Sequence, residues 1–188
     1  MRFRYKALKP MITVISGTNR ANSRTLLFAS HFVEQLRALG REAQLLDLAE
    51  LSHDFFPLDM YNPKAMTPEL LNLQRKYILD VKKFAIFVPE YNGSYPGVLK
   101  MFIDGISVNE YSGIFKGKHV ALVGIASGRA GNLLGMAHLG VTVSHMGGWL
   151  LPNRLPLSSI DKLIENGKLT NADTINAMKT HAEELIAA

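Results

Sequence analysis

The 188-residue sequence contains no cysteine. Disulfides, thiolate metal sites and thiol nucleophiles are therefore excluded, and the absence fits a reducing compartment. No apolar run approaches the roughly 18 residues that cross a bilayer as a helix. The basic start, MRFRYKALKP, is followed by only a short apolar run, so it lacks the pattern of a secretory signal peptide. We expect a cytoplasmic protein with no membrane span.

Long runs of one charge are also missing. Charged residues make up 20% of the chain and the formal net charge is +5, while 47% of the residues are hydrophobic. Without Lys/Arg runs and interleaved aromatic residues, nucleic-acid binding is not expected. The positive balance fits either a solvated basic surface or an anionic ligand such as a phosphate. The length predicts one domain over residues 1–188, with 1–10 as an N-terminal extension.

Strand-like and helix-like segments alternate along the chain. Short apolar runs predict strands at 11–16, 42–48, 84–89, 119–126 and 149–152, and helical spacing predicts helices at 23–39, 67–82, 96–107, 131–146 and 171–187. This alternation indicates an α/β protein whose parallel sheet is covered on both faces. We expect a flavodoxin-like, doubly wound, five-stranded parallel sheet of order 2-1-3-4-5 with helices on both faces.

Ligands of such sheets bind beyond the carboxyl ends of the strands, where the strand order reverses. This rule selects the three loops 16–25, 89–96 and 126–132. They follow the first, third and fourth predicted strands. Because these strands end at one edge of the sheet, we expect the three loops to meet there.

The first loop, SGTNRANSRT, is rich in donors and has no carboxylate. Its position before a helix adds unpaired N–H groups and the positive end of the helix dipole. Arg20 and Arg24 can neutralise an anion, and a phosphate site is the favoured interpretation. The alternative is a polar loop in which Ser23 only caps the helix. The hydroxyl donors are Ser16, Thr18, Ser23 and Thr25.

The first loop fits neither of the two common nucleotide signatures. It contains no GxxxxGK[ST] phosphate loop, and Gly17 stands alone where a dinucleotide fold would have GxGxxG. Asp47, at the end of the second strand, is the one feature that favours a dinucleotide.

The second loop, PEYNGSYPG, has the features of a site for a flat ring. Gly93 allows a close approach of the backbone to a ligand, and Tyr91 and Tyr95 offer planar surfaces. The third loop, ASGRAGN, places glycines on both sides of an arginine. Taken alone, this pattern is explained by the geometry of a turn between a strand and a helix.

The sequence lacks the motifs of metal-dependent and nucleophilic catalysis. There is no HExxH metal motif and no GxSxG nucleophile elbow. His138 and His145 lie seven residues apart on one predicted helix, and a solvated role is favoured over a metal site. We therefore expect no metal and no catalytic acid, base or nucleophile among the side chains.

Three segments together resemble the NADPH-dependent FMN reductases of the flavodoxin-like superfamily, which include quinone, chromate and azo-dye reductases. SGTNRANSRT is similar to the family's phosphate loop, G-S-x-R-x-x-S-x-N, and LLDLAEL to its L-x-D-L segment. PEYNGSYPGVLKMFID is close to P-x-Y-N-x-S-x-P-G-x-L-K-N-x-I-D. The resemblance covers about residues 11 to 155. Departures are Thr18 for the family's serine, Arg24 or Thr25 for an asparagine, and Met101 for another asparagine.

The resemblance implies non-covalently bound FMN. The first loop would hold the phosphate, the second would edge the isoalloxazine ring, and the third would close the far side. The implied cofactor-binding residues are Ser16, Thr18, Arg20, Asn22, Ser23, Arg24, Thr25, Pro89, Glu90, Tyr91, Asn92, Gly93, Ser127, Gly128 and Arg129.

The resemblance also implies an activity. NADPH or NADH would reduce the flavin, which would pass electrons to a small-molecule acceptor such as a quinone or free flavin, with no catalytic side chain. The family implies a homodimer or homotetramer, and we expect segments 50–66 and 153–170 to shape the acceptor pocket. A flavodoxin-like electron carrier without NADPH oxidation is the main alternative, although the +5 charge disfavours it. A regulatory or scaffolding protein with a degenerate site is a third.

Overall fold

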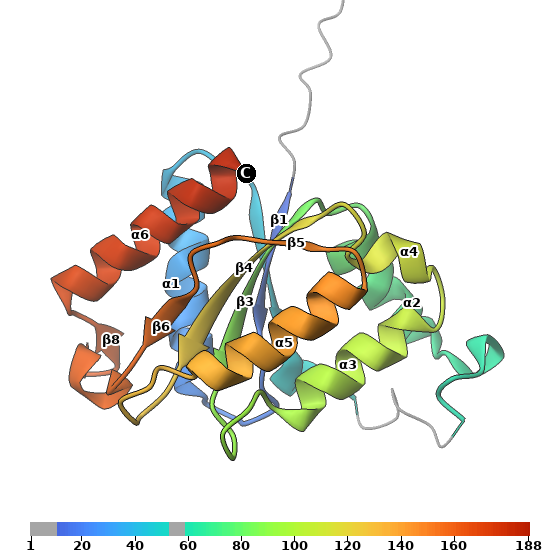
Figure 1. Cartoon of the computed structure of the whole chain (residues 1–188), viewed down its shortest axis with the longest axis horizontal. Coiled ribbons are helices and arrows are strands. Elements are labelled where there is room, and N and C mark those ends of the chain that lie inside the picture. The colour runs from blue at the N-terminus through green and yellow to red at the C-terminus, as the bar shows by residue number, and fades with distance from the viewer. Residues whose placement is uncertain (1–10, 53–58) are drawn as a thin grey trace, which may run out of the picture.

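The computed structural model describes residues 11–52 and 59–188, and the predicted N-terminal extension 1–10 and part of the loop 50–66 lie outside them. A central sheet has the order β2-β1-β3-β4-β5 with every pairing parallel (Figure 1), which confirms the predicted topology. Its strands are β1 (Ile12–Ser16), β2 (Ala43–Asp47), β3 (Lys83–Pro89), β4 (His119–Ile125) and β5 (Trp149–Leu150).

The last position of the sheet differs from the prediction. The strand expected at 149–152 stops early, and a second short strand, β6 (Leu155–Leu157), pairs parallel with β4 further along. The N–H of Leu151 still donates to the carbonyl of Val120, over 3.0 Å. The next residue is Pro152, which has no N–H to donate, so the ladder is interrupted there.

Alternate residues of each strand enter two separate cores. Val14 and Phe87 belong to the core under α1 (Arg24–Ala38) and α6 (Ala172–Ala187). Their neighbours Ile15 and Ile86 belong to the opposite core. The helices over that second face are α2 (Pro68–Gln74), α3 (Gly97–Ser107), α4 (Tyr111–Ile114) and α5 (Leu133–His145) (Figure 1). Both faces are therefore covered, as the apolar strands predict.

Several short elements were not predicted. The expected helix 67–82 is α2 followed by a π-helical turn, Arg75–Leu79. The segment 153–170, which the sequence analysis left without elements, contains a 3-10 turn at Ile160–Leu163 and the hairpin of β7 (Ile164–Glu165) with β8 (Lys168–Leu169). Further 3-10 turns lie at Leu48–Glu50 and Pro63–Ala65. None of the described helices has an apolar stretch long enough to cross a membrane.

The π-helical turn is held by a buried lysine. Lys118 is 2% exposed, and its Nζ donates to the carbonyls of Ile78 and Leu79 over 2.7 and 3.1 Å. These carbonyls lie at the end of the turn, and that of Ile78 also accepts from the N–H of Val81 over 3.2 Å. Burial, with the nearby charge of Lys82, lowers the pKa of Lys118 to about 8, and Asp80 opposes the shift only in part.

Because of the lowered pKa of Lys118, the free energy of unfolding varies with pH in the alkaline range. Between pH 8 and 10.5 the unfolded chain binds more protons at Lys118 than the folded chain, so its contribution to the free energy of unfolding rises with pH. The rise amounts to about 3 kcal/mol. We expect the difference in unfolding free energy between wild type and Lys118→Met, measured in urea at pH 7 and pH 10, to grow in favour of wild type. A difference that is the same at both pH values would contradict this.

Candidate functional site

The first loop leaves β1 through a tight turn that only glycine fits. The N–H of Gly17 donates to the carbonyl of Phe87 over 2.9 Å. A Cβ at Gly17 would lie 2.7 Å from that carbonyl oxygen and 3.0 Å from Cδ2 of Leu99. The lone glycine of the loop is therefore required by packing between β3 and α3.

Ser23 caps α1, as the alternative to a phosphate site predicts. Its hydroxyl oxygen accepts a hydrogen bond from the N–H of Leu26 over 3.2 Å. The first turn of α1 contains no acidic residue. The remaining unpaired N–H groups and the dipole at this end of α1 still favour an anion, so the cap and a phosphate site are compatible.

The second loop is a two-residue hairpin. Tyr91 and Ser94 exchange backbone hydrogen bonds of 3.0 and 3.1 Å. Asn92 and Gly93 between them have φ values of 52° and 75°. This is the turn for which Asn-Gly is the preferred sequence. The hairpin fixes the position of Tyr91, whose hydroxyl contacts the first loop.

A hydroxyl pair joins the first loop to the second. The Tyr91 hydroxyl and the Thr18 hydroxyl lie 2.6 Å apart. Thr18 is fully buried and also accepts a hydrogen bond from the N–H of Arg20, over 3.2 Å. On the other side of the hairpin, the N–H of Glu90 donates to the carbonyl of Ile125 over 2.9 Å. The hairpin thus connects the ends of β1 and β4.

The third loop is fixed by a buried asparagine that the sequence analysis missed. Asn132 is 1% exposed; its Nδ2 donates to the carbonyl of Val88 over 2.8 Å, and its Oδ1 accepts from the N–H of Gly135 over 3.1 Å. It therefore caps α5 and ties it to β3. An asparagine immediately before a helical pattern is the signal that would have identified it.

The three loops surround a pocket of about 440 Å³. Most of the predicted site residues line it, namely Arg20, Asn22, Ser23, Arg24, Thr25, Pro89, Glu90, Tyr91 and Ser127. Ala21, Ile125, Ala126 and Ile160 line it without having been predicted. The remaining predicted residues, Ser16, Thr18, Asn92, Gly93, Gly128 and Arg129, are not among those that line the pocket.

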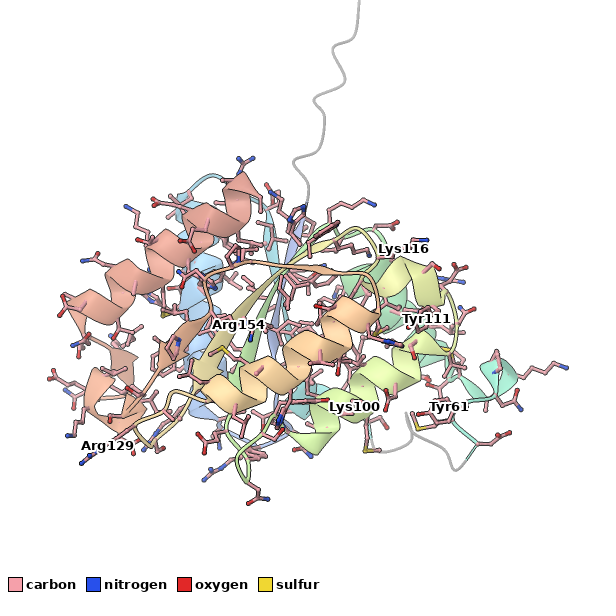
Figure 2. All side chains as sticks on the ribbon, viewed as in Figure 1. Tyr61, Lys100, Tyr111, Lys116, Arg129 and Arg154 are labelled. Carbon is pink, nitrogen blue, oxygen red and sulfur yellow. The ribbon has the colours of Figure 1, made fainter. Side chains whose placement is uncertain are left out.

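The residues outside the pocket differ in their surroundings. Ser16 is fully buried and its hydroxyl has no hydrogen-bond partner among the described residues, so a buried donor at the end of β1 is left unsatisfied there. Arg129 extends from the third loop into solvent (Figure 2). Asp47, the residue that favoured a dinucleotide, accepts a hydrogen bond from the N–H of Ala49 over 3.2 Å and so caps the turn after β2.

An acidic residue from far along the chain joins the first loop. The Arg24 guanidinium forms an ion pair with the carboxylate of Asp161, in the 3-10 turn Ile160–Leu163. The segment before this turn is bonded to the third loop, because the N–H groups of Ser159 and Ile160 donate to the carbonyls of Gly128 and Ala126. The first loop lacks a carboxylate in sequence, but the fold supplies one.

A second pocket, of about 470 Å³, adjoins the first at Tyr91. Tyr91 is the residue that lines both pockets. The other residues around the second pocket are Asn19, Leu48, Ala49, Leu51, Ser52, Pro96, Gly97, Val98 and Met101. It is thus built from the first loop, the segment after β2 and the start of α3.

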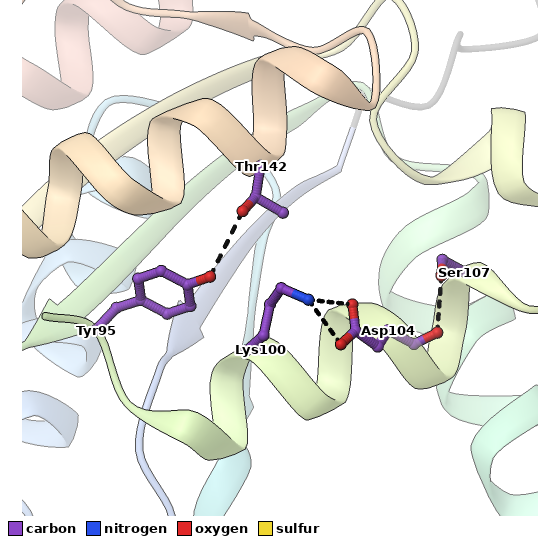
Figure 3. A network of polar contacts seen from close by, with 5 residues as sticks. All are labelled: Tyr95, Lys100, Asp104, Ser107 and Thr142. Carbon is purple, nitrogen blue, oxygen red and sulfur yellow. Dashed lines mark hydrogen bonds and ion pairs between the residues drawn. The ribbon is translucent and has the colours of Figure 1, made fainter. Parts of the chain in front are cut away.

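Polar contacts also join the second loop to α5. The Tyr95 hydroxyl lies 3.5 Å from the Thr142 hydroxyl, beside the Lys100–Asp104 ion pair of α3 (Figure 3). The Ser94 hydroxyl lies 2.9 Å from Nδ1 of His138. Among residues 11–52 and 59–188, no three His, Asp or Glu side chains come together as metal ligands would.

The chain is similar to flavin-dependent reductases along most of its length. Residues 10–161 match the sequence profile of the NADPH-dependent FMN reductase family. An FMN-dependent NADPH-azoreductase of Staphylococcus aureus is 28% identical over 155 residues, which cover 79% of this chain and 77% of that protein.

Solved structures of low sequence identity share the fold. An oxidoreductase from Corynebacterium diphtheriae has a TM-score of 0.73 at 18% identity, covering 96% of this chain and 97% of that one. The flavoenzyme FerB of Paracoccus denitrificans, an NAD(P)H:(acceptor) oxidoreductase, has a TM-score of 0.72 at 23% identity, covering 95% and 96%. An archaeal flavodoxin has a TM-score of 0.58 at 10% identity, covering 95% and 96%.

The hydroxyl pair between the loops can be tested with two matched substitutions. Tyr91→Phe removes the partner of the buried Thr18 hydroxyl and should lower the free energy of unfolding by about 1 kcal/mol. Tyr95→Phe removes a contact at 3.5 Å, the limit of a hydrogen bond, and should change it by less than about 0.5 kcal/mol. Urea denaturation measures both. Equal effects would show that the Tyr91 hydroxyl does not hold the loops together.

Proposed function

The chain belongs to the NADPH-dependent FMN reductase family, and from this premise we propose that the pocket between its three loops binds FMN. The protein is an oxidoreductase that takes its electrons from NAD(P)H. The observation that carries the assignment of the site is the pocket itself. It brings the donors of the first loop and the backbone of the second loop to one cavity of about 440 Å³.

The first loop supplies the phosphate end of the proposed site. Two arginines line the pocket, Arg20 in the loop and Arg24 in the first turn of α1, where the helix dipole favours an anion. The hydroxyls of Ser23 and Thr25 and the amide of Asn22 line the same wall. Two buried residues support this end of the site. The Thr18 hydroxyl holds Tyr91, and the Ser16 hydroxyl, unpaired among the described residues, is available to the ligand.

The second and third loops supply the ring end. Pro89, Glu90 and Tyr91 form one edge and Ser127 the other. Asn92 and Gly93 shape the hairpin that positions Tyr91, while Gly128 and the solvent-exposed Arg129 lie further out on the third loop. We assign Arg129 to attracting the phosphate-bearing nicotinamide donor. FMN, when bound, supplies the redox chemistry, so the chain needs only to bind, orient and shield it.

The second pocket is the proposed site of the small-molecule acceptor. Leu51 and Ser52 line it, which supports a role in acceptor binding for the segment 50–66. Tyr91 lines both pockets, so an acceptor in the second pocket would adjoin the flavin site. The segment 153–170 contributes Ile160 to the first pocket instead. Quinones and azo compounds fit walls that combine leucine, valine and methionine side chains with a tyrosine and an asparagine.

We place the enzyme in the cytoplasm as a homo-oligomer. The cysteine-free sequence supports a reducing compartment. The helices α3, α4 and α5 lie side by side on one face of the sheet (Figure 1). Exposed apolar side chains on these helices support oligomer formation. They are Met101 on α3, Tyr111 on α4, and Leu133, Leu134 and Val141 on α5.

The proposed activity is tested by steady-state oxidation of NADPH and NADH by the FMN-loaded protein, with quinones and azo dyes as acceptors. We expect parallel double-reciprocal lines, because donor and acceptor use the same flavin in turn. Binding of FMN without consumption of either nicotinamide, whatever the acceptor, would favour the electron carrier.

Two arginine variants test the phosphate site, one in the pocket and one as a control away from it. Arg20→Ala should weaken FMN binding by about 1.5–3 kcal/mol, the contribution of a charged hydrogen bond, and should lower the rate at limiting FMN. Arg75→Ala removes an exposed arginine from the π-helical turn, away from the pocket, and should leave both unchanged. Equal behaviour of the two variants would contradict the phosphate site.

The oligomer is tested by adding a charge to the apolar face. Val141 is 71% exposed on α5, and Val141→Glu should convert a dimer or tetramer into monomers in analytical ultracentrifugation. Asn176→Glu adds the same charge to the exposed side of α6 and should leave the mass unchanged. A monomeric wild-type protein would contradict the proposal.

A further inference from the structure

An ion pair bridges the first loop and the segment after β6. Arg24, at the start of α1, pairs with Asp161, and both side chains are about half exposed, at 54% and 51%. Arg24 lines the cofactor pocket, and so does Ile160, the residue before Asp161. The pair therefore lies beside the end of the pocket to which the phosphate is assigned.

This contact changes the charge available to a phosphate. The first loop carries two guanidinium groups and no acid of its own. Because Asp161 neutralises one of them, a phosphate that enters the pocket meets the charge of Arg20 and a guanidinium that is already paired. The loop therefore attracts an anion less strongly than its two arginines alone would suggest.

Asp161 is held where it is by the backbone around it. The N–H of Ser159 donates to the carbonyl of Gly128 over 2.9 Å, and the N–H of Ile160 donates to the carbonyl of Ala126 over 3.3 Å. Ile160 is 4% exposed and packs in the core under α1 and α6. The backbone that carries Asp161 is therefore fixed beside the pocket, and its carboxylate repels an anion that enters.

We infer that Asp161 competes with the phosphate of FMN for Arg24 and so sets how tightly the cofactor is held. This inference rests on the proposed function, since it takes FMN as the ligand. A phosphate that binds has to share Arg24 with the Asp161 carboxylate, which weakens its binding. The competition acts on the phosphate alone, so it should not affect a flavin that lacks one. Asp161 is a residue that determines cofactor affinity, and it takes no part in electron transfer.

The test is the dissociation constant of FMN and of riboflavin for the apoprotein, from quenching of flavin fluorescence. Asp161→Asn keeps the size of the side chain and removes its charge. It should tighten FMN binding about three- to tenfold and leave riboflavin binding unchanged. The gain should shrink in 0.5 M salt, because the charges are half exposed. Asp173→Asn, on the exposed first turn of α6, removes the same charge elsewhere and should change neither constant.

A double variant shows whether the effect passes through Arg24. Arg24→Gln combined with Asp161→Asn should show less of the gain than Asp161→Asn alone. Unchanged FMN binding in Asp161→Asn would overturn the inference. Weaker binding would also overturn it, since it would show that Asp161 orients Arg24 toward the phosphate. A wild-type protein that binds neither flavin would instead refute the proposed function, so the two failures can be told apart.

Discussion

The parallel register of β1, β3 and β4 is the constraint on which the site depends. Ser16 pairs with Phe87, and Pro89 pairs with Ile125, so the three strands end at the same edge of the sheet. Each strand then turns into a helix on one of the two faces, and the loops between strand and helix have to meet above that edge. Two contacts fix their distance, the hydroxyl pair of Thr18 with Tyr91 and the bond from Glu90 to Ile125. A pocket follows from this geometry before any ligand is considered.

Much of the fold could be predicted because the strands are apolar on both faces. Val14 and Ile15 point to opposite cores, and only a sheet covered on both sides buries both. The exceptions are confined to two places. Pro152 divides the last strand, and the π-helical turn depends on Lys118, a residue that follows the turn by a long stretch of chain. No pattern of neighbouring residues reveals contacts of this kind, because the partners are brought together only by the completed fold.

The candidate site likewise combines features set by neighbouring residues with features that depend on the completed fold. The phosphate-binding character of the first loop is local, since it depends on the residue types between β1 and α1 and on the end of a helix. The hairpin is local as well, because Asn92 and Gly93 specify its turn. Asp161 is the opposite case, and it alters the electrostatics that the loop alone would suggest. Ile160 and Ala126 line the pocket for a similar reason, as they belong to segments bonded to one another across the sheet edge.

Whether the first loop binds phosphate can be measured as the preference of the apoprotein for FMN over riboflavin. The two ligands share the ring and the ribityl chain and differ only in the phosphate. With charged hydrogen bonds from Arg20 and from the start of α1, FMN should bind at least about a hundredfold more tightly than riboflavin. Equal dissociation constants for the two ligands would show that the loop does not bind phosphate.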